Sequence, residues 1–344
     1  MLKMHGNFDC QIEKYIKQYN LDQQPISVNF RDIVPDLVKP DRATHLIHSY
    51  PAKLLMHIPY FFLNNSIFSK PSSFVLDPFA GSGTVLLESV VAGRNSYGAD
   101  ANPLARLISE VKTTKYSSEE LDFCLDEVSK LLNENTECYI PSGLDMDFWF
   151  LPDVQKSLGY IFSSIQKIDK DKYKKFLLVC FSNTIKKVSL ANPSIIVPVK
   201  LKKNYYPIEH PLYKKVNSRY QILETLNVKE FFLNIVKENI NRAKEFAHIV
   251  KSDVFSKIIS TDARKLTVTQ AENNELLPDE SVDLIITSPP YAGAQKYIRS
   301  SKLSLGWLEY FQEESFKTLD RKNIGRENYS KKDYNILIKT GLKE

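Results

Sequence analysis

The chain has 344 residues, 43% of them hydrophobic and 25% charged, with a formal net charge of +5 at pH 7. It contains no run of about 18 apolar residues, and the stretch MLKMHGNFDC lacks the apolar core of a secretory signal, so we expect a cytoplasmic protein without a membrane span. The four cysteines have neither CxxC spacing nor nearby histidines, which argues against a zinc site and a disulfide framework.

The first predicted elements lead up to a strand. Residues 1–44 mix charged and apolar positions without a clean period, and prolines interrupt their end, so we expect an N-terminal arm or a short helix. Residues 45–62 are apolar and aromatic, and the stretch SKPSS then supplies a turn. The residues FVLD that follow predict a strand that ends at Asp77.

A glycine turn, GSG at residues 81–83, follows this strand and opens a predicted helix. Such a turn brings backbone close to a ligand, and the helix N-terminus offers unpaired N–H groups. The Lys-Ser/Thr pair of a Walker loop is missing, and Leu86 stands where G-x-G-x-x-G has its third small residue, so phosphate is not the expected ligand. A second strand, NSYGAD, completes the opening half of a doubly wound sheet.

Residues 105–250 carry apolar residues at helical spacing in four stretches, so we expect a mainly helical insertion between the strands. Within it, residues 192–220 are rich in proline, tyrosine and lysine without a helical period, and we expect an extended or looping segment there. Residues 151–250 hold 18 Lys and Arg against 8 Asp and Glu. The basic character of the chain is therefore concentrated in this one block of the insertion.

The strand pattern resumes in FSKIISTDARKL, which places Asp262 at a strand end, and in SVDLIITSPPY, which ends in a proline pair. One more helix is expected in YIRSSKLSLGWLEYFQEE, and the polar tail after it contains one weak strand pattern, DYNILI. This order of elements predicts an α/β fold in which ligands collect at the carboxyl ends of parallel strands.

Three aspartates, Asp77, Asp100 and Asp262, stand at the ends of three predicted strands. Each one alone is typical of a helix cap or a turn. Together they suit a positively charged nucleoside, because Asp100 is placed to bind ribose hydroxyls, Asp262 to accept from an adenine amino group and Asp77 to meet a cationic amine. S-adenosylmethionine, with its sulfonium and ammonium groups, fits this description.

The stretch TSPPY, residues 287–291, forms a second group of candidate site residues. Two prolines after an apolar strand end the ladder in a rigid turn with outward carbonyls. The Ser288 hydroxyl, these carbonyls and the Tyr291 ring match a flat heterocycle with an exocyclic amine, which they would bind by hydrogen bonds and stacking. The alternative is an ordinary Pro-Pro loop.

The order HSYPAKL, VLDPFAGSGT, GADANP, STDARKL and DLIITSPPY resembles the DNA amino-methyltransferases of restriction-modification systems, which act on cytosine N4 or adenine N6. The resemblance covers residues 45–113 and 255–300 and implies a Rossmann-like, S-adenosylmethionine-dependent methyltransferase sheet. It implies that the cofactor is held by Tyr50, Pro51, Ala52, Lys53, Asp77, Phe79, Ala80, Gly81, Gly83, Asp100 and Asp262, and the flipped target base by Ser288, Pro289, Pro290 and Tyr291.

The implied reaction is direct attack of the exocyclic amine on the sulfonium methyl group, without a cysteine nucleophile or a metal. Hydrogen bonds to the Ser288 side chain and the Pro289 carbonyl would make the amine more nucleophilic, and Tyr291 would stack on a base extruded from double-stranded DNA. Serine at position 288 favours cytosine N4 in this family, with adenine N6 as the alternative.

The resemblance also suggests a division of the chain into an N-terminal arm (1–44), a catalytic domain (45–113 and 251–310), a helical, basic target-recognition region (114–250) and a polar tail (311–344). The basic insertion would face DNA phosphates, and its alternative is a solvated lysine-rich surface. The candidate DNA-binding residues are Lys202, Lys203, Lys214, Lys215 and Arg219.

The family's sheet continues through three more strands after the proline pair, but only 53 residues follow Tyr291 here. We therefore expect the C-terminal part of the sheet to be missing from the chain. The chain is then a fragment, or a second methyltransferase chain completes the sheet. The alternative is that the tail itself pairs with the sheet. A restriction endonuclease is a further implied partner. Competing hypotheses are methyl transfer to RNA or a protein amide, a non-catalytic DNA-binding subunit, and an NAD dehydrogenase.

Overall fold

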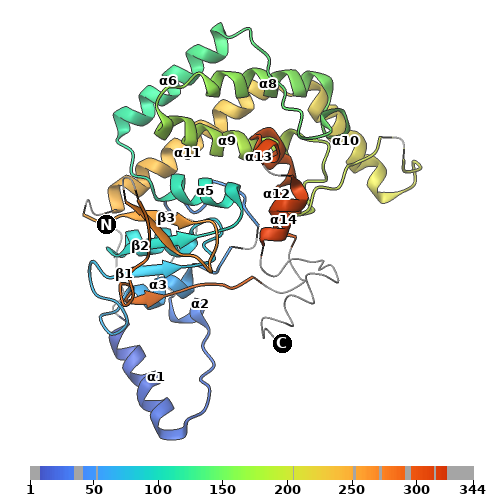
Figure 1. Cartoon of the computed structure of the whole chain (residues 1–344). Coiled ribbons are helices and arrows are strands. Elements are labelled where there is room, and N and C mark those ends of the chain that lie inside the picture. The colour runs from blue at the N-terminus through green and yellow to red at the C-terminus, as the bar shows by residue number, and fades with distance from the viewer. Residues whose placement is uncertain are drawn as a thin grey trace.

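The computed structural model describes residues 8–34, 42–51, 53–203, 205–250, 253–270, 273–290, 296–313 and 315–323. Within these ranges, no helix combines the length and the apolarity that a membrane crossing requires. The fold is a mixed α/β arrangement in which a small sheet lies beside a layer of long helices (Figure 1).

The sheet has four parallel strands in the order β3-β2-β1-β6. Its members are β1 (Phe74–Asp77), β2 (Asn95–Ala99), β3 (Ser256–Ser260) and β6 (Leu284–Ile285). Leu76 of β1 lies opposite Tyr97 of β2 on one side and opposite Ile285 of β6 on the other. The four strands and the α/β class predicted from the sequence are confirmed, and all four carboxyl ends meet at one edge of the sheet.

Helices α4 (Thr84–Val91) and α5 (Pro103–Thr113) follow the first two strands and pack on the sheet. All eight residues of α4 are buried, because α3 (His57–Leu63) covers the side that the sheet leaves open. The one acidic residue of α4, Glu88, is compensated there by Arg42 at 2.6 Å and His45 at 2.7 Å. The N-terminal segment 42–63 is therefore fixed against the helix that follows the glycine turn.

The helical prediction for residues 105–250 is confirmed in its main features. After α5 come α6 (Ser118–Glu134), α7 (Met146–Trp149), α8 (Pro152–Gln166), α9 (Asp171–Val188), α10 (Pro211–Thr225) and α11 (Val228–Ile249). The expectation of an extended segment over 192–220 is wrong for residues 211–220, which lie in α10. Pro211 occupies the first helical position, where the missing N–H costs nothing, and His210 caps the helix.

One hydrophobic core joins this helical layer to the helices that flank the sheet. The ring of Phe181 in α9 lies 5.6 Å from Phe162 of α8, 6.4 Å from Phe232 of α11 and 5.8 Å from Trp307, measured between ring centroids. Trp307 ends α12 (Tyr297–Trp307), the helix that comes after the TSPPY stretch in the chain. The helical layer and α12 are thus held in one packing unit.

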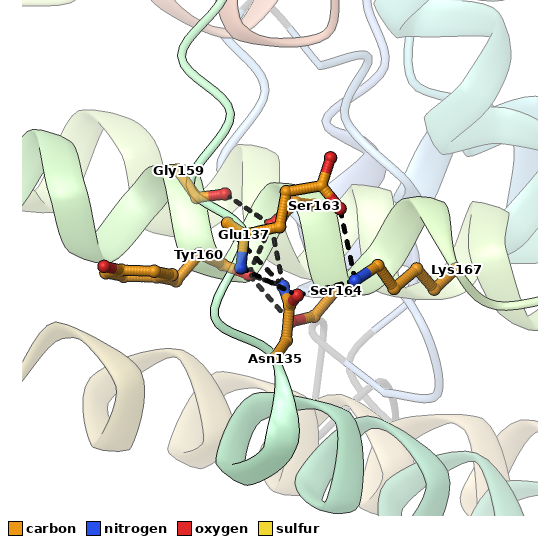
Figure 2. A network of polar contacts seen from close by, with 7 residues as sticks. All are labelled: Asn135, Glu137, Gly159, Tyr160, Ser163, Ser164 and Lys167. Atoms are coloured by element: carbon orange, nitrogen blue, oxygen red, sulfur yellow. Dashed lines mark hydrogen bonds and ion pairs between the residues drawn. The ribbon is translucent and has the colours of Figure 1, made fainter.

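A polar junction fixes the end of α6 against α8 (Figure 2). The Asn135 amide donates to the hydroxyl oxygens of Ser163 (2.8 Å) and Ser164 (3.0 Å), and Lys167 donates to the amide oxygen at 2.6 Å. Lys167 also pairs with Glu137 at 3.2 Å. The side-chain amide of Asn135 is therefore paired through both its nitrogen and its oxygen, as a polar group in a part-buried junction between helices needs.

The remaining elements lie at the two ends of the chain and beside the sheet. The N-terminal arm is a helix, α1 (Asp9–Asp22), which projects below the sheet and returns to the short helix α2 (Phe30–Ile33) (Figure 1). A hairpin of β4 (Thr267–Gln270) and β5 (Asn273–Leu276) was not predicted.

The helix expected over 297–314 is interrupted at Glu309, whose φ of 62° is left-handed, and continues as α13 (Tyr310–Glu313). A further helix, α14 (Phe316–Lys322), falls in the region expected to be a polar tail. The predicted DYNILI strand lies outside the described residues.

Candidate active site

A pocket lies where the carboxyl ends of the strands meet, next to the boundary between β1 and β6 at which the strand order reverses. Ligands of open α/β sheets collect at such a switch point. Ten residues singled out from the sequence line this one pocket: Tyr50, Lys53, Asp77, Phe79, Ala80, Gly81, Asp100, Asp262, Ser288 and Pro290. Pro51, Gly83 and Pro289 do not line it, and Ala52 and Tyr291 lie outside the described residues.

The glycine turn has two glycines with different roles. Gly83 has φ +74°, and a side-chain carbon there would come 2.8 Å from the Ser109 hydroxyl oxygen, so it allows α4 and α5 to approach closely. Gly81 has φ +51°, but a carbon there would meet nothing within 4 Å. Gly81 therefore leaves open space on the pocket side of the turn.

Asp100 connects the glycine turn to the end of β2. Its two carboxylate oxygens accept hydrogen bonds from the backbone N–H of Gly81 at 2.9 Å and of Asn102 at 2.8 Å. Burial raises the pKa of this carboxyl, and the two N–H donors oppose that rise. The structure thus holds Asp100 in a fixed orientation at the pocket wall, where its remaining lone pairs are available to a ligand.

Asp77 connects the end of β1 to the TSPPY stretch. Its Oδ1 accepts from the Thr287 hydroxyl at 2.6 Å and from the Phe79 N–H at 3.1 Å. Burial raises the pKa of this carboxyl to about 7, although both hydrogen bonds act to lower it. A cation bound beside Asp77 would favour its ionised form, which is the response expected of a site that holds an amine.

Asp262 is placed at the pocket by the end of β3, but it already has an ionic partner. Arg264 binds its two oxygens at 2.9 and 2.7 Å, and these hydrogen bonds lower the pKa of the carboxyl. Thr261 and Ala263, on either side of Asp262, also line the pocket. An interaction of Asp262 with an adenine amino group therefore shares the carboxylate with Arg264.

The N-terminal side of the pocket is formed by Tyr50 and Lys53. The Tyr50 hydroxyl accepts a 3.0 Å hydrogen bond from the Asn102 amide, which also donates to Ser301 of α12 at 3.3 Å. Burial raises the pKa of Tyr50, so it stays protonated. Lys53 donates to the carbonyls of His45 and His48, both at 2.9 Å, which fixes the segment that carries these residues.

Several lining residues were not found by sequence reasoning. Ser288 and Pro290 share the pocket with Tyr297 of α12 and with Lys322 and Asn323 at the end of α14. The glycine turn also contributes Thr84, the first residue of α4. Tyr297 and Thr84 could have been inferred from their closeness to the motifs, whereas Lys322 and Asn323 stand in a polar stretch without any local signal.

A second hollow adjoins the pocket and shares Lys53, Leu54 and Thr84 with it. Its lining also includes the basic residue types Arg31, His45 and His57. Burial lowers the pKa of both histidines, so the positive charges here are those of the arginine and the lysine. The pocket thus has acidic residues at the strand ends, and the adjoining hollow toward α3 has basic ones.

The five candidate DNA-binding residues differ in exposure and in the partners of their side chains. Lys202 and Lys214 are exposed. Lys203 pairs with Glu224 at 2.9 Å, and Lys215 donates to the Ser194 hydroxyl at 2.9 Å. Arg219 donates to the carbonyls of Lys187 and Ser189 at the end of α9, which is a structural role.

Comparison with known proteins places these features in a wider setting. Residues 21–110 match the family N6_N4_Mtase, described as DNA methylase. The chain is 27% identical over 314 residues to the Type II methyltransferase M.MvaI of Kocuria varians, an alignment that covers 86% of this chain and 63% of that protein. It is 24% identical over 346 residues to M.MjaII of Methanocaldococcus jannaschii, covering 77% of this chain and 63% of that protein.

A third similar protein is the Type II methyltransferase M.BsoBI of Geobacillus stearothermophilus, with 26% identity over 262 residues, 68% of this chain and 47% of that protein. The chain thus spans under two thirds of the length of these relatives. No solved structure matches it. The family match covers the glycine turn and Asp100.

Proposed function

We propose that this chain is an S-adenosylmethionine-dependent DNA methyltransferase of a restriction-modification system. It methylates the exocyclic amine of a base extruded from double-stranded DNA, with cytosine N4 favoured over adenine N6. The observation that carries the proposal is the convergence of Asp77, Asp100, Gly81 and Ser288 on one pocket at the switch point of the sheet. The Type II methyltransferases similar to the chain support the same class.

The residues present fit the proposed cofactor. Gly81 lines the pocket with open space beside it, and Asp77 and Asp100 offer carboxylate oxygens to the amine and the ribose. The basic hollow around Lys53 and Arg31 suits the carboxylate of the same molecule. When bound, S-adenosylmethionine supplies a methyl group on a positively charged sulfur, which a neutral amine can attack.

Ser288 and its neighbours are assigned to the base. The Ser288 hydroxyl and the Pro289 carbonyl accept hydrogen bonds from the exocyclic amine, which keeps its lone pair available for attack. Thr287 holds the start of this turn through its bond to Asp77, so the base site and the cofactor site keep a fixed spacing. Tyr291, the next residue, is proposed to stack on the base.

The choice of cytosine N4 rests on Ser288. The family resemblance favours cytosine where serine opens the proline-proline motif, and adenine N6 is the alternative substrate. The helical region 114–250 is proposed to bind the DNA around the target, since its residues 151–250 hold 18 Lys and Arg against 8 Asp and Glu. The exposed Lys202 and Lys214 are proposed to contact the DNA phosphates.

The test is a methyl-transfer assay on mixed-sequence DNA. The purified chain is incubated with methyl-labelled S-adenosylmethionine, and the DNA is digested to nucleosides that are then separated. We expect label in N4-methylcytosine, at least about 100-fold reduced in Ser288→Ala and unchanged in Ser118→Ala, an exposed serine on α6. Label in N6-methyladenine would identify adenine as the target base in place of cytosine. Label in RNA or protein alone would overturn the proposal that DNA is the substrate.

A second candidate function is a methyltransferase subunit that needs a further chain. The observation that favours it is strand β6, which has two residues and, within the described residues, pairs with β1 alone, leaving Ile285 59% exposed. An edge strand of this kind accepts another strand. The assay distinguishes the two candidates, since a subunit would bind S-adenosylhomocysteine and yet transfer no methyl group until its partner chain is added.

A further inference from the structure

A short loop between α9 and α10 has an unusual combination of order and exposed apolar side chains. It is closed at its base by an antiparallel bridge between Ala191 and Lys200 and by a 2.8 Å hydrogen bond from the Asn192 N–H to the Val199 carbonyl. Residues 192–199, with the sequence NPSIIVPV, form the loop itself. We refer to these residues as the 192–199 loop.

The tip of the 192–199 loop presents branched apolar side chains to water. Ile195 is 40% exposed, Ile196 59% and Val199 49%. An isolated exposed isoleucine needs no explanation, but three within five positions at the end of one loop form a patch.

The tip is held in place from both neighbouring helices. Lys186 of α9 donates to the carbonyls of Ile195 at 3.0 Å and Ile196 at 2.9 Å. Lys215 of α10 donates to the Ser194 hydroxyl at 2.9 Å. Prolines at both ends of the loop restrict its backbone further. The apolar side chains are therefore exposed by a fixed backbone, which is the arrangement expected of a contact surface.

The loop lies directly beside the candidate active site. Ile196 and Pro198 line a cavity together with Tyr50 and with Ser300 and Ser301 of α12. Tyr50 also lines the active-site pocket, so the two hollows share a lining residue. In Figure 1 the connection between α9 and α10 passes close to α12, at the side of the molecule toward which the strands point.

The surroundings of the loop are basic. Lys186 and Lys187 precede it, and Lys200, Lys202 and Lys203 follow it. This charge favours a polyanion over another protein as the binding partner of the apolar tip. Proteins that deform duplex DNA combine these two features, with cations on the phosphates and an apolar wedge between the bases.

We propose that Ile195 and Ile196 form a wedge that enters the base stack of duplex DNA and fills the space left by the extruded base. The inference rests on the proposed function, because a base in a duplex must leave the stack before it reaches Ser288. Extrusion exposes the faces of the neighbouring base pairs to water, and an apolar side chain that covers them recovers part of the cost. The fixed loop offers its isoleucines without further loss of backbone entropy.

The test compares two duplexes by fluorescence anisotropy and needs neither the recognition sequence nor catalysis. One is a labelled mixed-sequence duplex, and the other has the same sequence with one abasic sugar, where a wedge can enter without extruding a base. We expect the wild-type chain to bind the abasic duplex about fivefold to tenfold more tightly than the intact one. In the double variant Ile195→Ala/Ile196→Ala this preference is expected to vanish, while binding to the intact duplex changes less than twofold.

The matched control is Ile222→Ala, which removes an isoleucine that is 55% exposed on α10 and should keep the full preference. Circular dichroism of all three proteins should be the same, since both sites are on the surface. An unchanged preference in the double variant, or no preference in the wild-type chain, would overturn the wedge. Failure of the proposed function is a separate result, seen as absence of methyl transfer and of S-adenosylhomocysteine binding by the wild-type chain.

Discussion

The hydroxyl of Thr287 donates a 2.6 Å hydrogen bond to Oδ1 of Asp77, although the two residues are 210 positions apart in the chain. Asp77 ends β1 and Thr287 stands two residues beyond β6, so the bond closes the gap between the two strands at the switch point. It joins the part of the pocket assigned to the cofactor to the part assigned to the base. It also lowers the pKa of Asp77, which burial raises to about 7.

Replacing Thr287 by valine keeps the shape of the side chain and removes the hydroxyl. The pKa of Asp77 should then rise further, so that less of the carboxylate is ionised at neutral pH. We expect binding of S-adenosylhomocysteine at pH 7 to weaken about tenfold, from the loss of about 1.5 kcal/mol of a hydrogen bond to a charged group. Titration calorimetry between pH 6 and 9 should show the loss shrinking as the pH rises. Thr287→Ser should behave like the wild type, and a loss equal at every pH would mean that Thr287 has only a packing role.

The raised pKa of Asp77 also predicts how stability depends on pH. Between the ordinary pKa of 3.8 and the folded value of about 7, the folded chain holds a proton that the unfolded chain has released. Unfolding therefore releases a proton, and the contribution of Asp77 to stability falls as the pH rises through this window and stays low above it. Asp77→Asn removes this effect, so the variant should be more stable than the wild type at pH 8 and equally stable near pH 4.

Asp100→Asn should give a smaller gain in stability at pH 8 than Asp77→Asn, although burial raises the pKa of Asp100 too. Both Asp100 oxygens accept from backbone N–H groups, so an amide would direct one N–H against another, whereas Asp77 accepts both of its bonds on Oδ1. Urea unfolding at pH 4, 6 and 8 measures both variants, with Asp126→Asn, an exposed aspartate on α6, as the control. Both variants should lose cofactor binding, and a stabilised Asp77→Asn that still binds would contradict the role assigned to this carboxylate.

The two glycines of the turn should respond differently to alanine. Gly81 has a left-handed φ and open space around the position of an added carbon, so we expect Gly81→Ala to lose about 1 kcal/mol of stability. Because Gly81 lines the pocket, we also expect the added methyl group to take up space that the cofactor needs and to lower its affinity more than about tenfold. Gly83→Ala also forces a carbon to 2.8 Å from the Ser109 hydroxyl oxygen, so its stability loss should be about 3 kcal/mol. Thermal unfolding and calorimetry on both proteins check this. If the two variants lost the same stability and the same cofactor affinity, the two glycines would not have the different roles assigned to them.

The strands and the pocket loops could be predicted from the sequence because their signals are local. A short apolar run before Asp77 and a glycine turn after it suffice to place β1 and the start of α4, and the proline pair ends β6 in the same way. The convergence of the aspartates followed from one rule, that parallel strands present their carboxyl ends at one edge. Their hydrogen-bond partners could not be inferred in this way, because Thr287 reaches Asp77 only through the pairing of β1 with β6.

Other features depend on contacts between segments far apart in the chain. The prolines and lysines of 192–220 suggested a loop throughout, yet Pro211 starts α10, and the apolar residues Val216, Tyr220 and Leu223 bury one face of it. Lys322 and Asn323 reach the pocket because α14 packs near α12, and nothing in their polar surroundings indicates this. The ion pair that Arg264 makes with Asp262 was likewise missed, although only two positions separate them.

Lys112 in the last turn of α5 is fully buried, and within the described part of the chain its amine has no hydrogen-bond partner. Burial holds the pKa of this amine well below its usual range, and the charge of Lys53 adds to the effect, while Glu88 opposes it. Glu88 is already paired with Arg42 and His45. The lysine is therefore neutral in the folded protein at pH values where it is charged in the unfolded chain.

Lys112→Met should stabilise the protein by about 1 to 3 kcal/mol at pH 7, because it removes an unpaired polar group from the core and keeps the length of the side chain. Between its lowered folded pKa and the ordinary value of 10.5, the unfolded wild-type chain binds one proton more than the folded one, so wild-type stability rises with pH. The gain from methionine should accordingly shrink between pH 7 and pH 9.5 in urea unfolding. The exposed Lys130→Met on α6 should change little. A variant less stable than the wild type at both pH values would show that the lysine is charged in the folded state and held by the carboxylate of Glu88.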